Sequence, residues 1–167
     1  MDAYEGEAFD AVSEQNKKDI GKGLTQQSYH ISAGIGAVDA FLREHEETRD
    51  EIIESHPELC FRGLLGRQLQ HSKKTAAGIG ERLGALGDQL DDPGTLLAEV
   101  AGDLVDGLDD GDVDEIELDD VVDAMGLGVT AMEGREGLLY LPKDWKRDYE
   151  KLPMRMAYRG DSVRSER

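Results

Sequence analysis

Apolar side chains recur every three or four residues along most of the chain, which is the spacing of one face of an α-helix. The clearest stripe has intervals of four, three and four residues and consists of Ile79, Leu83, Leu86 and Leu90. The pattern predicts helical segments at residues 2–19, 25–54, 59–90, 95–108 and 115–125. The predicted fold class is therefore mainly α, in the form of a small helical bundle.

The helical spacing is lost toward the C-terminal end of the chain. Residues 129–141 contain two Glu-Gly pairs and end in the apolar run Leu138-Leu139-Tyr140-Leu141, which Pro142 closes. An apolar run between glycines and a proline is typical of a strand rather than a helix. This stretch predicts a short β-hairpin or strand, followed by an extended C-terminal arm.

The sign of the charge changes close to Pro142. The first 142 residues hold 11 basic and 32 acidic side chains, a net charge of −21, whereas residues 143–167 hold eight basic and five acidic ones, a net charge of +3. The arm also contains the one tryptophan of the sequence, Trp145. We therefore predict an acidic helical body at residues 1–142 and a basic, aromatic arm at residues 143–167.

The overall charge of −18 indicates adaptation to high salt. Like charges at this density weaken a compact state in dilute buffer, but molar salt shortens the Debye length to about 3 Å and screens them. Few lysines, 20 glycines and 5% aromatic residues complete a composition that resembles the proteins of halophilic archaea and their viruses. An acidic disordered protein would have a similar composition, but the helical spacing of the apolar residues favours a folded chain.

The sequence lacks the motifs of known catalytic and metal sites. The single cysteine, Cys60, excludes an internal disulfide, and the four histidines show none of the spacings of a zinc site. Neither a nucleophile elbow nor a phosphate-binding glycine loop is present. We therefore expect no enzyme activity, no catalytic residues and no cofactor.

Hydropathy gives no indication of a membrane location. No apolar run approaches the ~20 residues of a membrane span, and the first residues have neither the basic nor the apolar region of a signal peptide. We expect no membrane partner and a cytoplasmic type of protein.

A weak calcium alternative lies between residues 106 and 117. This stretch can be aligned with an EF-hand loop whose oxygen ligands would be Asp106, Asp110, Asp112, Asp114 and Glu117. Leu108, however, takes the third position, where an oxygen ligand is required, and the other acids are expected in so acidic a chain. We therefore expect no metal site, with calcium binding as the alternative.

The C-terminal arm is the best candidate for a partner-binding region. It combines aromatic, methionine and basic residues of the types enriched at protein interfaces, namely Trp145, Arg147, Tyr149, Arg155, Met156, Tyr158 and Arg159. Nucleic acid is a poor partner because the rest of the chain is strongly negative and counterion release adds little affinity in molar salt. The arm therefore predicts docking onto another protein and no sequence-specific nucleic-acid binding.

A small helical body, a short hairpin near residues 133–141 and a C-terminal arm together resemble the head–tail connector (adaptor) proteins of tailed viruses. The resemblance implies a virion structural protein that is assembled in the host cytoplasm. Its subunits would form a homo-oligomeric ring, and the arm would dock onto a portal-like or tail-like partner. Two other classes stay open: an acidic protein-interaction or regulatory module of a halophilic cell, and an EF-hand-like calcium-binding protein.

Overall fold

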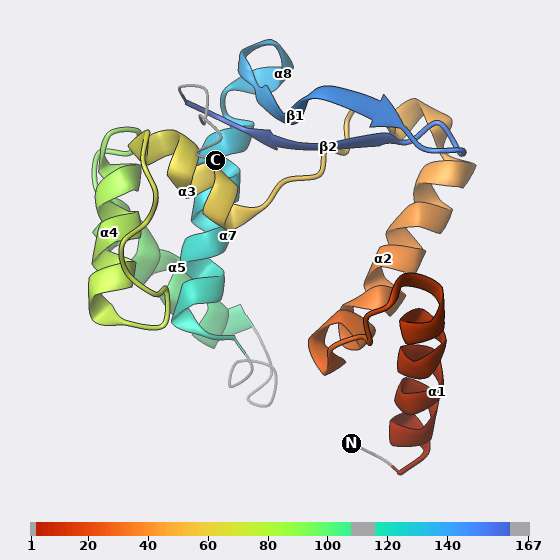
Figure 1. The fold of residues 1–167 in the computed structure, drawn as a ribbon. Helices are drawn as coiled ribbons and strands as arrows, with labels where there is room; N and C mark the ends of the chain where they lie inside the picture. The colour runs from red at the N-terminus through yellow and green to blue at the C-terminus, as the bar shows by residue number, and fades with distance from the viewer. Residues whose placement is uncertain (1–2, 108–115, 161–167) are drawn as a thin grey trace. The chain divides into compact units, whose positions relative to one another are not determined.

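The computed structural model describes residues 3–107 and 116–160 (Figure 1). The chain divides into two compact units, Met1–Ile52 and Ile53–Arg167. Among the described residues, no helix has both the length and the apolar content needed to cross a membrane.

The first unit consists of helices α1 (Ala3–Ile20) and α2 (Gln26–Glu44) and the 3-10 helix η1 (Glu46–Thr48). The side chain of Thr25 caps α2 by accepting a hydrogen bond from the Ser28 N–H at 3.1 Å. The rings of Phe9 and Tyr29 meet edge to face at 5.5 Å between centroids. No residue of α2 is buried, so this unit lacks an apolar core along its longer helix.

The predicted helix over residues 25–54 ends ten residues early, at Glu44. Arg49 folds back on the helix end, where its Nε donates to the Leu42 carbonyl at 2.6 Å. This contact satisfies a carbonyl that has no partner inside the helix. The charged stretch after Arg43 therefore forms a short 3-10 turn instead of another helical turn.

The second unit contains most of the helices and the sheet. Its elements are α3 (Pro57–Leu65), α4 (Ala76–Gly87), α5 (Pro93–Gly107), α7 (Leu118–Ala131), α8 (Gly134–Gly137), β1 (Leu139–Arg147) and β2 (Pro153–Tyr158). Helix α7 packs against α3, α4 and α5 (Figure 1). The buried core that these helices share consists of Phe61, Ala85, Leu86, Val122, Met125 and Val129.

The prediction of one continuous helix over residues 59–90 is wrong. Gly66 ends α3 in the left-handed conformation, with φ of 63°, which glycine adopts without steric cost. Helix α4 then begins after Thr75, whose side chain accepts from the Gly78 N–H at 3.1 Å. The ten residues between the two helices, 66–75, form a loop that we call the 66–75 loop.

The predicted helix over residues 115–125 is longer in the structure, since α7 continues through Gly126 and Gly128 to Ala131. Gly126 does not end the helix but allows it to approach the ring of buried Phe61: a Cβ atom at this position would lie 2.7 Å from that ring. The glycine therefore serves close packing of α7 on α3.

The mainly α fold with a short β-hairpin is confirmed, but the hairpin lies further along the chain than residues 129–141. Strands β1 and β2 pair antiparallel, with Leu139 opposite Tyr158 and Leu141 opposite Met156. Their register is interrupted between Leu141 and Lys146. Pro142, which has no N–H to donate, lies in that interruption and is therefore tolerated inside β1.

Residues of the predicted arm form the second half of this hairpin. The N–H of Ala157 donates to the Glu54 carbonyl at 2.8 Å, which ties β2 to the segment before α3. The functional boundary near Pro142 stays a prediction, whereas the structural division of the chain falls between Ile52 and Ile53.

Two glycines of α7 test the packing of the core. At Gly128 an added Cβ would meet nothing within 4 Å, in contrast to Gly126. We expect Gly126→Ala to lower the free energy of unfolding by about 1–3 kcal/mol, because Phe61 is fully buried and its ring cannot move aside. Gly128→Ala should raise it by about 1 kcal/mol, because alanine favours the helix. Denaturant unfolding followed by circular dichroism measures both, and equal effects would contradict the packing of α7 on Phe61.

Candidate functional site

A buried arginine stands at the centre of the second unit. Arg82 of α4 is 1% exposed, and its Nη1 donates to the carbonyls of Gly78 at 3.0 Å and His71 at 3.3 Å. Its Nη2 forms an ion pair with the carboxylate of Glu58 on α3. The guanidinium also lies 5.6 Å from the centroid of the Phe61 ring. Arg82 thus joins α3, α4 and the 66–75 loop.

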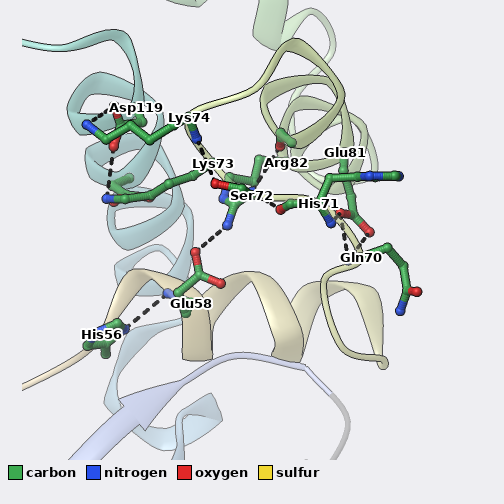
Figure 2. Close-up of polar contacts among 12 residues, drawn as sticks. His56, Glu58, Gln70, His71, Ser72, Lys73, Lys74, Glu81, Arg82 and Asp119 are labelled. Atoms are coloured by element: carbon green, nitrogen blue, oxygen red, sulfur yellow. Dashed lines mark hydrogen bonds and ion pairs between the residues drawn. The ribbon is translucent and has the colours of Figure 1, made fainter.

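The 66–75 loop is held on α4 by a second charged side chain. The carboxylate of Glu81 accepts hydrogen bonds from the Gln70 N–H at 2.9 Å and from the His71 N–H at 3.1 Å (Figure 2). It also accepts one from Arg67 Nη1 at 2.5 Å. The bond from Arg67, followed by those from the two backbone groups, holds the pKa of Glu81 below its usual range. The loop is therefore fixed by main-chain contacts as well as by a salt bridge.

Gly78 permits this close approach of loop and helix. A Cβ atom at Gly78 would lie 1.9 Å from the backbone carbonyl oxygen of Ser72. Any larger residue would therefore push the loop away from α4.

Two consecutive lysines extend from this loop toward α7 (Figure 2). Lys73 Nζ lies 2.6 Å from Asp123 Oδ2 and 3.0 Å from Asp119 Oδ2. Lys74 Nζ lies 2.9 Å from Asp119 Oδ1 and also pairs with Glu117. We call these five residues the lysine–aspartate cluster.

Hydrogen bonding keeps the central groups of the cluster ionised. The bonds to Asp123 and then Asp119 raise the pKa of Lys73 to about 12. The bond from Lys74, followed by that from Lys73, holds the pKa of Asp119 below its usual range, although burial acts in the opposite direction. Neither group changes its charge near neutral pH, so neither is matched to general acid–base catalysis.

The lysine–aspartate cluster lies at one side of a cavity of about 500 Å³. The polar residues of its lining are Lys73, Lys74, Thr75 and Asp119, and the rest are Ala76, Ile79, Gly80, Leu83 and Leu118. The backbone N–H groups of Ala76 and Ala77 lie in the first turn of α4 and have no acceptor inside that helix. An apolar wall with a few convergent charged groups is the usual form of a small-molecule site.

Two buried side-chain atoms of residues that contact the 66–75 loop lack a hydrogen-bond partner, Arg82 Nε and Asp123 Oδ1. Asp119 Oδ2 also accepts no well-aligned hydrogen bond, although it is ion-paired with Lys73. Buried charged groups stabilise a fold less than apolar residues of the same volume. The cluster is therefore poorly explained by stability alone.

The structure brings three of the predicted partner-binding residues together on the hairpin. The Arg155 guanidinium lies 3.8 Å from the ring centroid of Tyr140 and 4.3 Å from that of Trp145. Arg147 lies 5.6 Å from the same Trp145 ring. These distances are those of cation–π contacts, which hold the side chains of the hairpin in one arrangement.

The other predicted partner-binding residues lie in different surroundings. Tyr149 is 87% exposed and Met156 is 36% exposed, whereas Tyr158 is buried in the core. Arg159 is engaged within the unit, because its Nε pairs with Glu133 at 2.7 Å. Docking through Tyr149 and Met156 stays a prediction, whereas Tyr158 is not available at the surface.

The candidate calcium ligands lie only partly within the described residues. Asp106 is exposed near the end of α5, and Glu117 precedes α7 and pairs with Lys74. Asp110, Asp112 and Asp114 lie outside the described residues. Within residues 3–107 and 116–160, no group of three or more His, Cys, Asp or Glu side chains is arranged to hold a metal ion.

Asp119→Asn tests the electrostatics of the cluster through its pH dependence. A carboxylate whose pKa is lowered in the folded state stabilises the fold above its unfolded value of 3.8 and loses this effect as the pH falls through the folded pKa. At neutral pH we expect the variant to lose about 2 kcal/mol of unfolding free energy. The difference in unfolding free energy between wild type and variant should become smaller below about pH 4.

The matched control is Asp103→Asn, which makes the same change at an exposed position of α5. Urea unfolding at a series of pH values measures both differences. A difference for Asp119→Asn that stays constant across the acid range would contradict the lowered pKa.

The comparisons with known proteins give a family but no function. The chain matches the model of the family described as "Protein of unknown function (DUF429)" over residues 2–147. No curated protein and no solved structure matches it. The resemblance to head–tail connector proteins is therefore wrong, because the match assigns nearly the whole chain to a different family. The chain belongs to the DUF429 family.

Proposed function

We propose that the chain is a non-enzymatic binding protein that takes a small amphipathic anion in the cavity between α4 and α7. The observation that carries this proposal is the convergence of Lys73, Lys74 and the first turn of α4 on one side of an apolar-walled cavity. The ligand would have one anionic head group and an apolar body.

The head group would be bound by Lys74 and the start of α4. Lys74 is the more accessible lysine, with 56% of its side chain exposed, and its partner Glu117 is 60% exposed. An exposed ion pair of this kind contributes about 0–1 kcal/mol, so an anionic ligand can replace Glu117 at small cost. The free N–H groups of Ala76 and Ala77 and the helix dipole favour the same charge.

Lys73 keeps the acids of the site neutralised while the ligand is bound. Its Nζ contacts both Asp119 and Asp123, and its raised pKa keeps it protonated at neutral pH. Asp119 is 5% exposed at its side chain, so it is less open to a ligand than Lys74. A cationic ligand would have to compete with two lysines for this carboxylate.

The apolar body would lie against Ile79 and Leu83 of α4 and Leu118 of α7. Leu118 is 52% exposed, and covering it would add a favourable burial of apolar area. These three side chains offer no hydrogen-bond donor or acceptor, so a hydrocarbon chain or ring fits against them better than a sugar.

Three ligands with the same alkyl chain test this proposal: hexanoate, hexylamine and hexanol. We expect hexanoate to bind most tightly, because only its head group is complementary to Lys74 and the α4 N-terminus. Isothermal titration calorimetry on the full chain, in the high salt that its charge favours, measures the three affinities. Tighter binding of hexylamine than of hexanoate would contradict the proposal.

Lys74→Gln should weaken hexanoate binding about tenfold, since it removes a charged hydrogen-bond donor worth about 1.4 kcal/mol. The matched control is Lys146→Gln, the same change at an exposed position of β1. We expect the control to bind hexanoate as wild type does. Equal affinities of the two variants would place the ligand elsewhere.

A further inference from the structure

Helix α2 carries few charged side chains and is only partly covered within its own unit, where Tyr29 packs on Phe9. From Ser28 to Leu42 its only charged side chain is Asp39, in a chain in which 34% of the residues are charged. No residue of α2 is buried. An aliphatic stripe on a helix is normally packed against another element, yet the stripe of α2 stays exposed in this structure.

Four aliphatic side chains of α2 form one stripe, which we call the seam. Ile31, Ile35, Val38 and Leu42 follow one another at intervals of four, three and four residues, the spacing of the contact positions of a coiled coil. Ile31 is 54% exposed, Ile35 62% and Val38 52%. The residues beside the seam are small or uncharged except Asp39, which pairs with Arg43 at 2.8 Å.

Charge indicates what can cover this seam. Helix α2 has two acids and one arginine, a net charge of −1, whereas α1 has five acids and two lysines, a net charge of −3. Helices α5 and α7 each have three acids and no basic residue. A contact between two copies through α1, α5 or α7 would bring like charges together, whereas a contact along α2 brings little charge together.

We propose that α2 is a self-association helix, and that the occupant of the seam is the same helix of a second copy of this chain. Ile35 and Leu42 would take the first apolar position of the heptad and Ile31 and Val38 the second. Branched residues at the second position favour three- or four-stranded over two-stranded assemblies. The seam spans only two heptads, so the assembly is concentration-dependent. This proposal is independent of the ligand site, which lies in the second unit.

Analytical ultracentrifugation of the full chain in molar KCl, over a range of concentrations, tests the proposal. We expect a mass that rises with concentration to a small multiple of 18.4 kDa. Ile35→Glu should shift the dissociation midpoint to at least tenfold higher concentration, because it places a charge in the seam. Ala40→Glu adds the same charge on the opposite side of α2 and should leave the midpoint near that of wild type.

If Ile35→Glu unfolds the first unit, the milder variant Ile35→Ala tests the proposal instead. Ile35→Ala retains the helix and should also raise the midpoint, with the helical signal of the assembled protein unchanged. A wild-type chain that stays monomeric at all concentrations would overturn the proposal and mean that other parts of the same chain cover α2. Equal effects of Ile35→Glu and Ala40→Glu would also overturn it.

Discussion

The second unit depends on a guanidinium that is buried among apolar side chains. Arg82 lies beside Phe61 in the core, with one nitrogen on the Glu58 carboxylate and another on two backbone carbonyls. An unpaired charge in such a place would destabilise the fold by about 3–5 kcal/mol. The positions of α3 and of the 66–75 loop are therefore constrained to those that supply Arg82 with its partners.

The loop in turn determines where the two lysines lie. Because Glu81 holds the N–H groups of Gln70 and His71, the following residues start from a fixed point and reach α7 with both ammonium groups. Lys73 and Asp119 are both held ionised, so the resulting site has a fixed charge pattern instead of a proton-transfer pair. A fixed arrangement of charges beside a preformed apolar wall would lower the entropic cost of binding, because few side chains would have to be ordered when a ligand enters.

Much of the helical architecture could be predicted from the sequence, since the spacing of Ile79, Leu83 and Leu86 reports a helix whatever surrounds it. The break at Gly66 and the early end of α2 could not, because both depend on contacts that the pattern does not contain. The hairpin lies beyond residues 129–141 because Pro142, which is typical of a strand end, is accommodated inside β1 at the interruption of the register.

The proposed ligand site could not be predicted from the sequence for a related reason. Glu58, Lys73 and Asp119 are far apart in sequence. In so acidic a chain, a single carboxylate does not by itself indicate a functional site. One signal was present: Lys73 and Lys74 are the only lysines between Lys22 and Lys143. The burial of Arg82 also could not be predicted, because its partners Glu58 and the His71 carbonyl are brought to it only by the fold.

The buried charges of Glu81 and Arg82 fix the 66–75 loop without a bound ligand. Amide hydrogen exchange at Gln70 and His71, whose N–H groups donate to Glu81, tests this claim most directly. We expect protection comparable to that of the amides inside α4, since opening the loop would expose Glu81 and Arg82 together. Exchange at the rate of an unstructured peptide would contradict it.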